Sequence, residues 1–174
     1  MDVDAYQRTV LALKDTVFSY ATFLLGDPEE ARDIAQEALI RLWVRRDRVA
    51  DEAAARPWLV RTAHNLCLDR IRSAKVSRIG AYADPEALAA IAADGEAAPD
   101  RRAALRETTE AISGALALLA PRDRGVLLMR EVHGLRYDEM AEVLGLPLGT
   151  LKAVVHRARE RFREKLLAAG VRPA

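Results

Sequence analysis

The sequence predicts an all-α fold of two small helical domains joined by a flexible acidic linker, with a helix-turn-helix in the C-terminal domain. Apolar residues recur three or four apart along most of the chain, which is the period of a buried helix face, and no strand pattern stands out. Residues 77–100 interrupt this pattern with Ala, Asp, Glu, Gly and Pro, and carry one Arg against five acidic residues. We therefore divide the chain into domains at 1–76 and 101–174, with a linker at 77–100.

The N-terminal domain opens with two predicted helices. The first covers residues 3–25, and Gly26 ends it because glycine accepts the left-handed backbone of a helix C-terminus. Asp27 can cap the second helix, and Pro28 suits its first position. The apolar stripe of this second helix lies within 31–43.

A third helix is expected from residue 57 to about 75, after a loop at 47–56. Pro57 favours a start there, because the residue before a proline avoids helical geometry. One polar stripe of this helix contains Arg61, Asn65, Asp69 and Arg72, with Trp58 nearby. Aromatic, Arg and Asn side chains together suit single-stranded DNA. The alternative is a solvated stripe with a local Asp69–Arg72 pair and a core tryptophan.

Two further helices are expected in the C-terminal domain before its most informative stretch. They run from about 101 to 120 and from 122 to 133. A short apolar-faced helix then ends at Gly145, and Pro147 blocks its continuation. The last helix runs from about Leu148 to Gly170. This spacing is typical of a helix-turn-helix.

The last predicted helix has a basic outer face. Lys152, His156, Arg159 and Arg163 follow at steps of four, three and four, so they share one stripe. Residues 151–174 carry seven Lys or Arg against two Glu. A helix-turn-helix can place such a helix in the DNA major groove. The alternative is an αα-corner with a solvated basic face, which usually mixes the two signs of charge more evenly.

The composition of the 174 residues excludes several classes of protein. Cys67 is the single cysteine, so no intramolecular disulfide or zinc-finger spacing exists, and a buried apolar role is expected for it. No signal peptide opens the chain and no apolar run could span a bilayer, which favours a cytoplasmic protein without membrane insertion. The three histidines are far apart, and no phosphate loop or nucleophile elbow is present. We expect no enzyme activity, metal or cofactor.

Three segments in this order resemble bacterial RNA polymerase sigma factors of the extracytoplasmic function (ECF) group, in the sigma-70 family. Residues 27–43 read DPEEARDIAQEALIRLW and are similar to the polymerase-binding region of that family. Residues 56–72 read RPWLVRTAHNLCLDRIR and are similar to the helix that opens and reads the −10 element. Residues 119–166 are similar to the −35-reading domain. The resemblance covers nearly the whole chain.

The resemblance implies partners and roles for individual residues. The partners would be core RNA polymerase, promoter DNA as a −35 duplex and a −10 single strand, and an anti-sigma factor. The residues that would face the clamp helices of the polymerase are Asp33, Gln36 and Glu37. Those matching the −10 helix are Trp58, Arg61, Asn65, Asp69 and Arg72. Those matching the −35 recognition helix are Thr150, Lys152, His156, Arg157, Arg159 and Arg163.

The chain departs from the family pattern at a few positions. Leu39 stands where Phe is frequent, and Ala153 and Val154 replace the usual Ser and Arg. These two changes remove a hydroxyl and a cation from the start of the recognition helix, so −35 preference is expected to differ from the family norm or to depend more on phosphate contacts. Arg136 replaces a Ser that commonly caps the first helix of the motif, and Arg cannot accept the free amide hydrogen bonds.

Two other functions fit parts of the chain. A conventional helix-turn-helix regulator that binds duplex DNA without polymerase would explain the C-terminal domain alone. A helical adaptor would leave both basic stripes unexplained. Residues 27–72 favour the sigma factor over either alternative.

Overall fold

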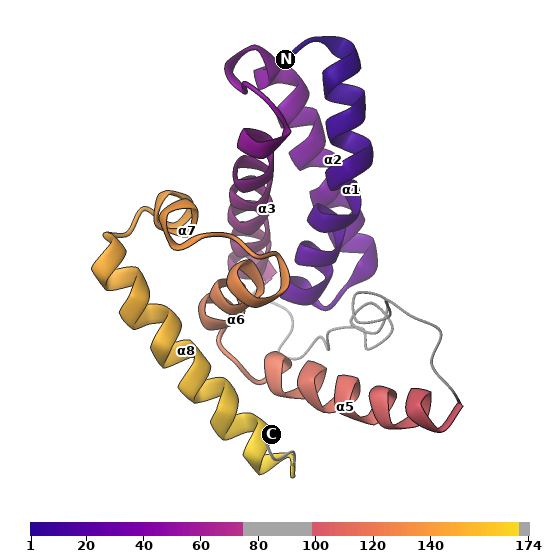
Figure 1. Cartoon of the computed structure of the whole chain (residues 1–174), viewed down its shortest axis with the longest axis vertical. Coiled ribbons are helices and arrows are strands. Elements are labelled where there is room, and N and C mark those ends of the chain that lie inside the picture. The colour runs from indigo at the N-terminus through magenta and orange to yellow at the C-terminus, as the bar shows by residue number, and fades with distance from the viewer. Residues whose placement is uncertain (75–98, 171–174) are drawn as a thin grey trace.

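The computed structural model of the chain describes residues 1–74 and 99–170, which form helices and contain no strand (Figure 1). The helices are α1 (Val3–Leu25), α2 (Pro28–Arg45), α3 (Glu52–Ala74), α5 (Pro99–Ala117), α6 (Pro121–Leu127), α7 (Tyr137–Leu144) and α8 (Leu148–Ala168). A 3₁₀ turn, η1 (Arg46–Arg48), follows α2, and a π-helical turn, η2 (Leu128–Val132), follows α6. The linker predicted at 77–100 lies outside the described residues, except that Pro99 and Asp100 belong to α5.

Helices α1, α2 and α3 pack into a bundle whose first two helices were predicted correctly. Gly26 ends α1 with a φ of 74° and donates its N–H to the carbonyl of Thr22. The Asp27 carboxylate then accepts hydrogen bonds from the backbone N–H groups of Glu29 and Glu30, at 2.9 and 3.2 Å. This cap turns the chain sharply, so α2 lies against α1.

The start predicted for the third helix was wrong, because α3 begins at Glu52 and contains Pro57. Asp51 caps it: its side chain accepts from the N–H of Ala54 at 2.9 Å, and its carbonyl accepts from Ala55 at 3.0 Å. A good cap followed by alanines starts the helix, and Pro57 removes one internal hydrogen bond without ending it. The extra turn brings Arg56 to the C-terminal domain.

The helix predicted over 122–133 is instead α6 followed by the π-helical turn η2. His133 donates its N–H to the carbonyl of Leu128 at 2.9 Å, which closes the wider ring of a π turn. Leu135 then donates to the carbonyl of Met129 at 2.9 Å. The turn leads the chain into α7 and sets Glu131 beside α8.

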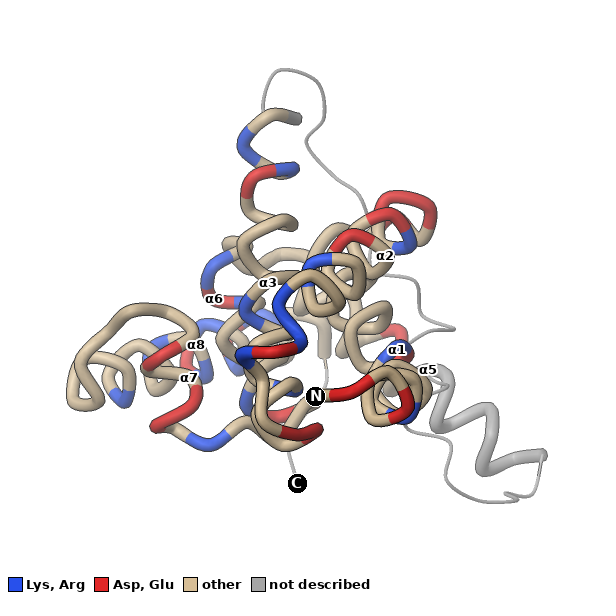
Figure 2. The backbone as a smooth tube through the Cα atoms, turned by 90° about the horizontal axis from the view of Figure 1, so that it is seen from above, with Lys and Arg blue, Asp and Glu red and all other residues tan. Residues whose placement is uncertain are grey.

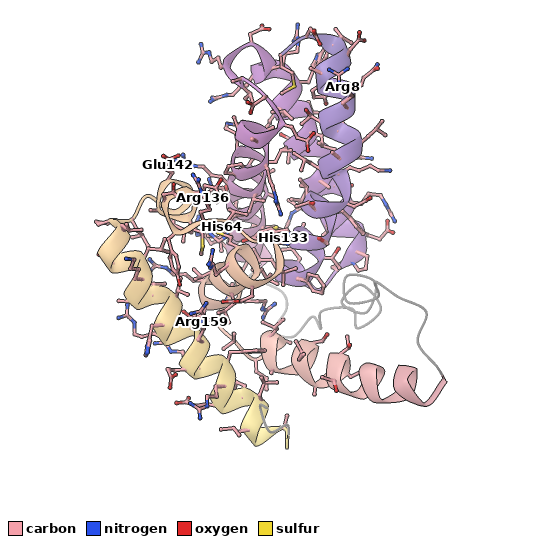
Figure 3. The ribbon with its side chains drawn as sticks, viewed as in Figure 1. Arg8, His64, His133, Arg136, Glu142 and Arg159 are labelled. Carbon is pink, nitrogen blue, oxygen red and sulfur yellow. The ribbon has the colours of Figure 1, made fainter. Side chains whose placement is uncertain are left out.

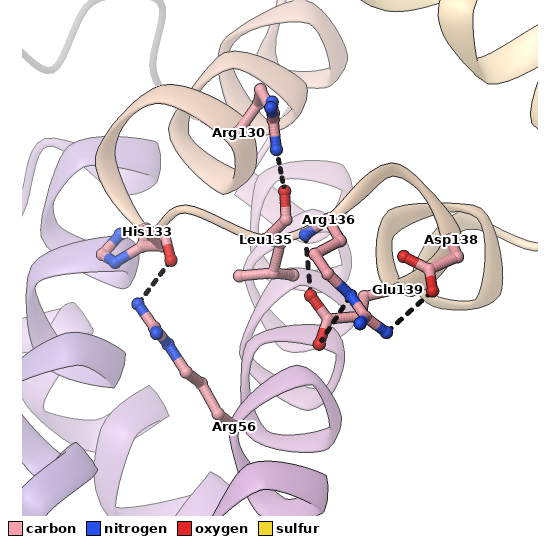
Figure 4. A network of polar contacts seen from close by, with 7 residues as sticks. All are labelled: Arg56, Arg130, His133, Leu135, Arg136, Asp138 and Glu139. Atoms are coloured by element: carbon pink, nitrogen blue, oxygen red, sulfur yellow. Dashed lines mark hydrogen bonds and ion pairs between the residues drawn. The ribbon is translucent and has the colours of Figure 1, made fainter.

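The two domains pack against each other. Helix α7 lies on α3, and α6 and η2 lie on α1 (Figure 1). Arg56 donates a hydrogen bond to the carbonyl of His133 (Figure 4), and Arg124 donates to the carbonyl of Leu24 at 3.1 Å. The buried apolar side chains of both domains belong to one continuous core.

Candidate nucleic-acid interface

Helices α7 and α8 form the predicted helix-turn-helix. Gly145 ends α7 with a φ of 63°, and Leu146 donates to the carbonyl of Ala141 at 3.0 Å. Pro147 precedes α8 with extended backbone geometry. The buried residues that join the two helices are Met140, Val143, Leu151, Val154, Val155 and Ala158. This packing fixes which face of α8 is exposed.

The start of α7 shows how the chain manages without a capping serine. Arg136 at the cap position accepts no hydrogen bond, as predicted from its chemistry. The Glu139 carboxylate accepts from the Arg136 backbone N–H at 2.7 Å, and the Arg136 side chain pairs with Asp138 at 2.7 Å (Figure 4). The acidic first turn therefore partly replaces the missing cap.

The exposed face of α8 contains the residues predicted for −35 recognition. Those exposed are Thr150, Lys152, His156, Arg157, Arg159 and Arg163. Ala153, one of the two departures from the family pattern, is also exposed. Val154 is buried in the core, so a side chain at this position does not lie on the exposed face. Of the two departures, only Ala153 alters the surface that α8 presents.

Two arginines of α8 are held by acidic residues of the same domain. Arg159, which is labelled in Figure 3, donates to the Glu131 carboxylate through Nε at 2.9 Å and through Nη2 at 2.5 Å, and this bond raises the pKa of Arg159. Arg161 donates to Asp123 at 2.6 Å. The π turn thus orients the Arg159 guanidinium, a contact for which the sequence carries no local signal because Glu131 lies 28 residues away.

Helix α3 carries the second predicted DNA face. Its exposed members are Arg61, Asn65, Asp69 and Arg72, and Trp58 is half-buried. Asp69 and Arg72 form an ion pair at 2.8 Å in which both side chains are 70% exposed. Figure 2 shows acidic and basic positions near the end of α3. The Asp69–Arg72 pair expected for a merely solvated stripe therefore exists. Arg61 and Asn65 are exposed to solvent.

Helix α2 presents a mixed polar and apolar face. Asp33 and Gln36 are exposed, and the Glu37 carboxylate, half-buried, accepts from Arg41 at 2.7 Å. Figure 2 shows acidic positions gathered along this helix. Ile40 and Val44 extend the same face and are 57% and 72% exposed. Their spacing from Gln36 could have identified them in the sequence, since steps of four keep residues on one face.

The described residues offer little for other chemistry. Cys67 is buried, as predicted, and burial raises the pKa of its thiol to about 12, so it is a poor nucleophile. Within 1–74 and 99–170, no three His, Cys, Asp or Glu side chains gather in a way that could hold a metal ion. In the same part of the chain, no helix is both long and apolar enough to cross a membrane.

A helix-turn-helix with an exposed basic face, carried on a two-domain helical fold, is typical of DNA-binding proteins, and comparison with known families specifies the class further. Residues 9–76 match the Sigma-70 region 2 family, and residues 109–162 match the Sigma-70 region 4 family. The chain belongs to the sigma-70 family of transcription initiation factors, in its ECF group. The match to region 2 excludes the conventional helix-turn-helix regulator, which would lack that domain.

Two curated relatives agree with this assignment, and a solved structure has a similar fold. The chain is 34% identical to the ECF RNA polymerase sigma factor SigW of Bacillus subtilis over 173 residues, covering 95% of this chain and 90% of the relative. It is 30% identical to the RNA polymerase sigma-E factor of Streptomyces coelicolor over 167 residues, covering 96% and 89%. Its fold is similar to that of the sigma factor RpoE in complex with the anti-sigma factor NepR from Bartonella quintana, with a TM-score of 0.72, 22% identity and coverage of 94% and 98%.

Proposed function

We propose that this chain recruits core RNA polymerase with α2 and reads promoter DNA with α3 and α8, by binding alone and without covalent chemistry. The observation that carries the proposal is that each matched sigma region contains one exposed polar or basic helix face: that of α3 lies in region 2, and that of α8 lies in region 4. The division into a region 2 domain at 1–76, a linker at 77–100 and a region 4 domain at 101–174 belongs to this proposal. The site of action is the cytoplasm, where polymerase and promoter meet.

Helix α3 would hold the unpaired bases of the −10 element. Arg61 and Asn65 are exposed, so a guanidinium and an amide can reach bases or backbone without losing an internal partner. Trp58 and Asp69 would support this face rather than read it. Trp58 is half-buried and Asp69 is ion-paired with Arg72, which fits a supporting role.

Helix α2 would bind the clamp helices of the polymerase. Asp33, Gln36 and Glu37 supply the polar contacts of this face. The exposed Ile40 and Val44 add apolar surface at its end, which protein interfaces bury at their centre.

An anti-sigma factor is the further partner we propose. The structural neighbour RpoE is described in complex with the anti-sigma factor NepR. Family membership and this shared fold support a partner of the same class for the present chain.

Run-off transcription on a promoter library, with purified core polymerase and with or without this chain, tests the proposal directly. Transcripts that appear only with the chain and share −10 and −35 sequences are expected. A folded chain that binds duplex DNA yet yields no transcripts with core polymerase would contradict the function.

The Asn65→Ala substitution is expected to impair promoter melting while core polymerase binding is retained. Losing one base or backbone contact costs about 1–3 kcal/mol, so open-complex formation should fall by roughly fivefold or more. Permanganate footprinting of the −10 region measures melting, and a pull-down with core polymerase measures docking. Gln7→Ala removes an exposed amide from α1 and is the matched control. Loss of polymerase binding in Asn65→Ala would show that α3 has a different role.

The Glu131→Gln substitution is expected to strengthen binding to −35 duplex DNA. It removes a carboxylate from beside the DNA face and releases Arg159 for a phosphate, so affinity should rise and its salt dependence should steepen by about one unit of slope. Arg159→Ala should change both quantities in the opposite direction. Glu164→Gln removes the same charge from an exposed site on α8 and is the control. Weaker DNA binding by Glu131→Gln than by its control would contradict this prediction and would mean that Glu131 holds Arg159 in the orientation that DNA binding requires.

A further inference from the structure

The outermost line of α8 begins with a glycine and an alanine. Successive residues of an α-helix are rotated by about 100° around its axis, and four buried residues define the inner face of α8: Leu151, Val154, Val155 and Ala158. The residues that lie farthest from this inner face are all exposed, and they are Gly149, Ala153, His156 and Glu160. A Cβ placed on Gly149 would meet no atom within 4 Å, so the surface at the start of this line is open.

Exposed hydrogen-bond donors lie on both sides of this line. Lys152 and Arg159 lie on one side, and Thr150 and Arg157 lie on the other. A helix in the major groove has a phosphate backbone on each side, so donors on both flanks can meet the two strands while the outermost line faces the base edges. Glu160 lies on the same line two turns farther on, where DNA phosphates would repel its carboxylate. Base contact by α8 is therefore centred on its first two turns.

The short side chains at the start of the line allow α8 to lie deep in the groove. A helix with its side chains is about 10–12 Å across and the major groove is about 12 Å wide, so long side chains at the centre would hold the helix away from the bases. Gly149 and Ala153 remove this obstacle over about 6 Å of helix, or about two base pairs. The Ala153 methyl group is then the side-chain atom that meets a base edge in this part of the groove.

A methyl group selects among base edges because it can neither donate nor accept a hydrogen bond. A polar edge packed against it loses its water and gains no partner, which costs free energy. Thymine is the base that presents an apolar group, its 5-methyl, in the major groove. We propose that Ala153 reads a thymine of the −35 element through contact between these two methyl groups. The inference rests on the proposed function and specifies the base chemistry that the start of α8 selects.

Removing the methyl group from the DNA tests this contact directly. Holoenzyme assembled from core polymerase and the full-length chain first selects promoter fragments whose −35 region is randomised, and the selected sequence is expected to contain the thymine. Each thymine of that sequence is then replaced by 2′-deoxyuridine, which lacks only the 5-methyl group. Since burial of one such group is worth about fourfold in affinity, one of these replacements should weaken promoter binding by the wild-type holoenzyme about fourfold.

Removing the methyl group from the protein completes the test. Ala153→Gly lacks it, and Ala168→Gly is the matched control because it makes the same change at an exposed position at the end of α8. The ratio of affinities for the thymine and uracil promoters should stay near about four in the control and fall to about one in Ala153→Gly. A weaker helix lowers both affinities alike and leaves this ratio unchanged. A wild-type ratio of one at every thymine, or equal ratios in the two variants, would overturn the inference.

Ala153→Asn provides a second measurement that does not depend on a glycine in the helix. An Asn side chain pairs with N6 and N7 of adenine in the major groove, so the base selected at this position should change from thymine to adenine while the other selected positions remain. An unchanged selection by Ala153→Asn would overturn the inference. Failure of the wild-type holoenzyme to select any −35 sequence would overturn the proposed function as well. A selected sequence whose thymines are not coupled to residue 153 would overturn this inference alone.

Discussion

Lowering the pH from 7 to 4.5 is expected to reduce the free energy of unfolding by about 2 kcal/mol for each of two buried histidines. Burial lowers the pKa of His64 and of His133 from 6.5 to about 4. In the unfolded chain both imidazoles gain a proton near pH 6.5, while in the folded chain they stay neutral. The folded state is therefore fully favoured above about pH 6.5, and this advantage is lost as the pH falls toward 4.

The surroundings of both rings explain why they remain neutral. After burial, the largest contributions to the low pKa of His64 come from the positive charges of Arg72 and Arg122, and for His133 from that of Arg56. Nε2 of His133 is buried and has no hydrogen-bond partner, so no acceptor compensates a proton there. No carboxylate is among the causes that shift either pKa.

Thermal or urea unfolding at pH 7, 5.5 and 4.5 measures this loss. His64→Asn can keep a hydrogen bond to Tyr20, because the Asn side-chain amide occupies the place of Nδ1. Combined with His133→Asn, it should flatten the pH dependence by about 4 kcal/mol between pH 7 and 4.5 relative to the wild-type chain. An unchanged pH profile in the double variant would mean that other groups cause the loss.

Local signals predicted most of the helices and the exposed faces. Gly26, Asp27 and Gly145 act at helix ends in the way their chemistry requires, and the stripes on α3 and α8 are exposed as their periods indicate. The predicted start of α3 was wrong because Pro57 was taken as a helix boundary. The Asp51 cap and the alanines after it outweigh the one hydrogen bond that Pro57 removes. The helix predicted over 122–133 exists, but its second half is a π turn, and this was not predicted because a π turn differs from an α-helix by one residue per ring, which apolar spacing does not resolve.

Contacts between the domains could not be predicted from spacing. His64 and His133 were treated as unrelated because they are far apart in the chain, yet both rings lie against Tyr20. Gly125 has no local reason to be glycine, since it lies inside a helix with ordinary geometry. Its reason is the approach of α1 and α3, which only the packing of distant helices reveals.

Arg124 is a buried charge at the contact between the two domains. Its Nη2 donates to the carbonyls of Ala117 and Leu119 at 2.8 and 3.2 Å, and its Nη1 donates to the carbonyl of Leu24 at 3.1 Å. These carbonyls lie at the ends of α5 and α1, where unpaired C=O groups carry partial negative charge. Two helix C-termini therefore stabilise the guanidinium without a carboxylate, although burial lowers the pKa of Arg124.

Replacing Arg124 by Met is expected to lower the free energy of unfolding by about 3 kcal/mol, because three carbonyls lose their donor in a site that water cannot easily enter. Relief of the buried charge offsets part of this loss, and Arg124→Lys should fall between, since an ammonium cannot serve three carbonyls in fixed directions. Arg122→Met removes the same charge from an exposed position of the same helix and should change stability by about 0.5 kcal/mol or less. Urea unfolding at pH 7 compares the three variants. Equal stability of Arg124→Met and Arg122→Met would show that the hydrogen bonds of the Arg124 guanidinium only offset the cost of burying its charge. The apolar core alone would then hold α6 against α1.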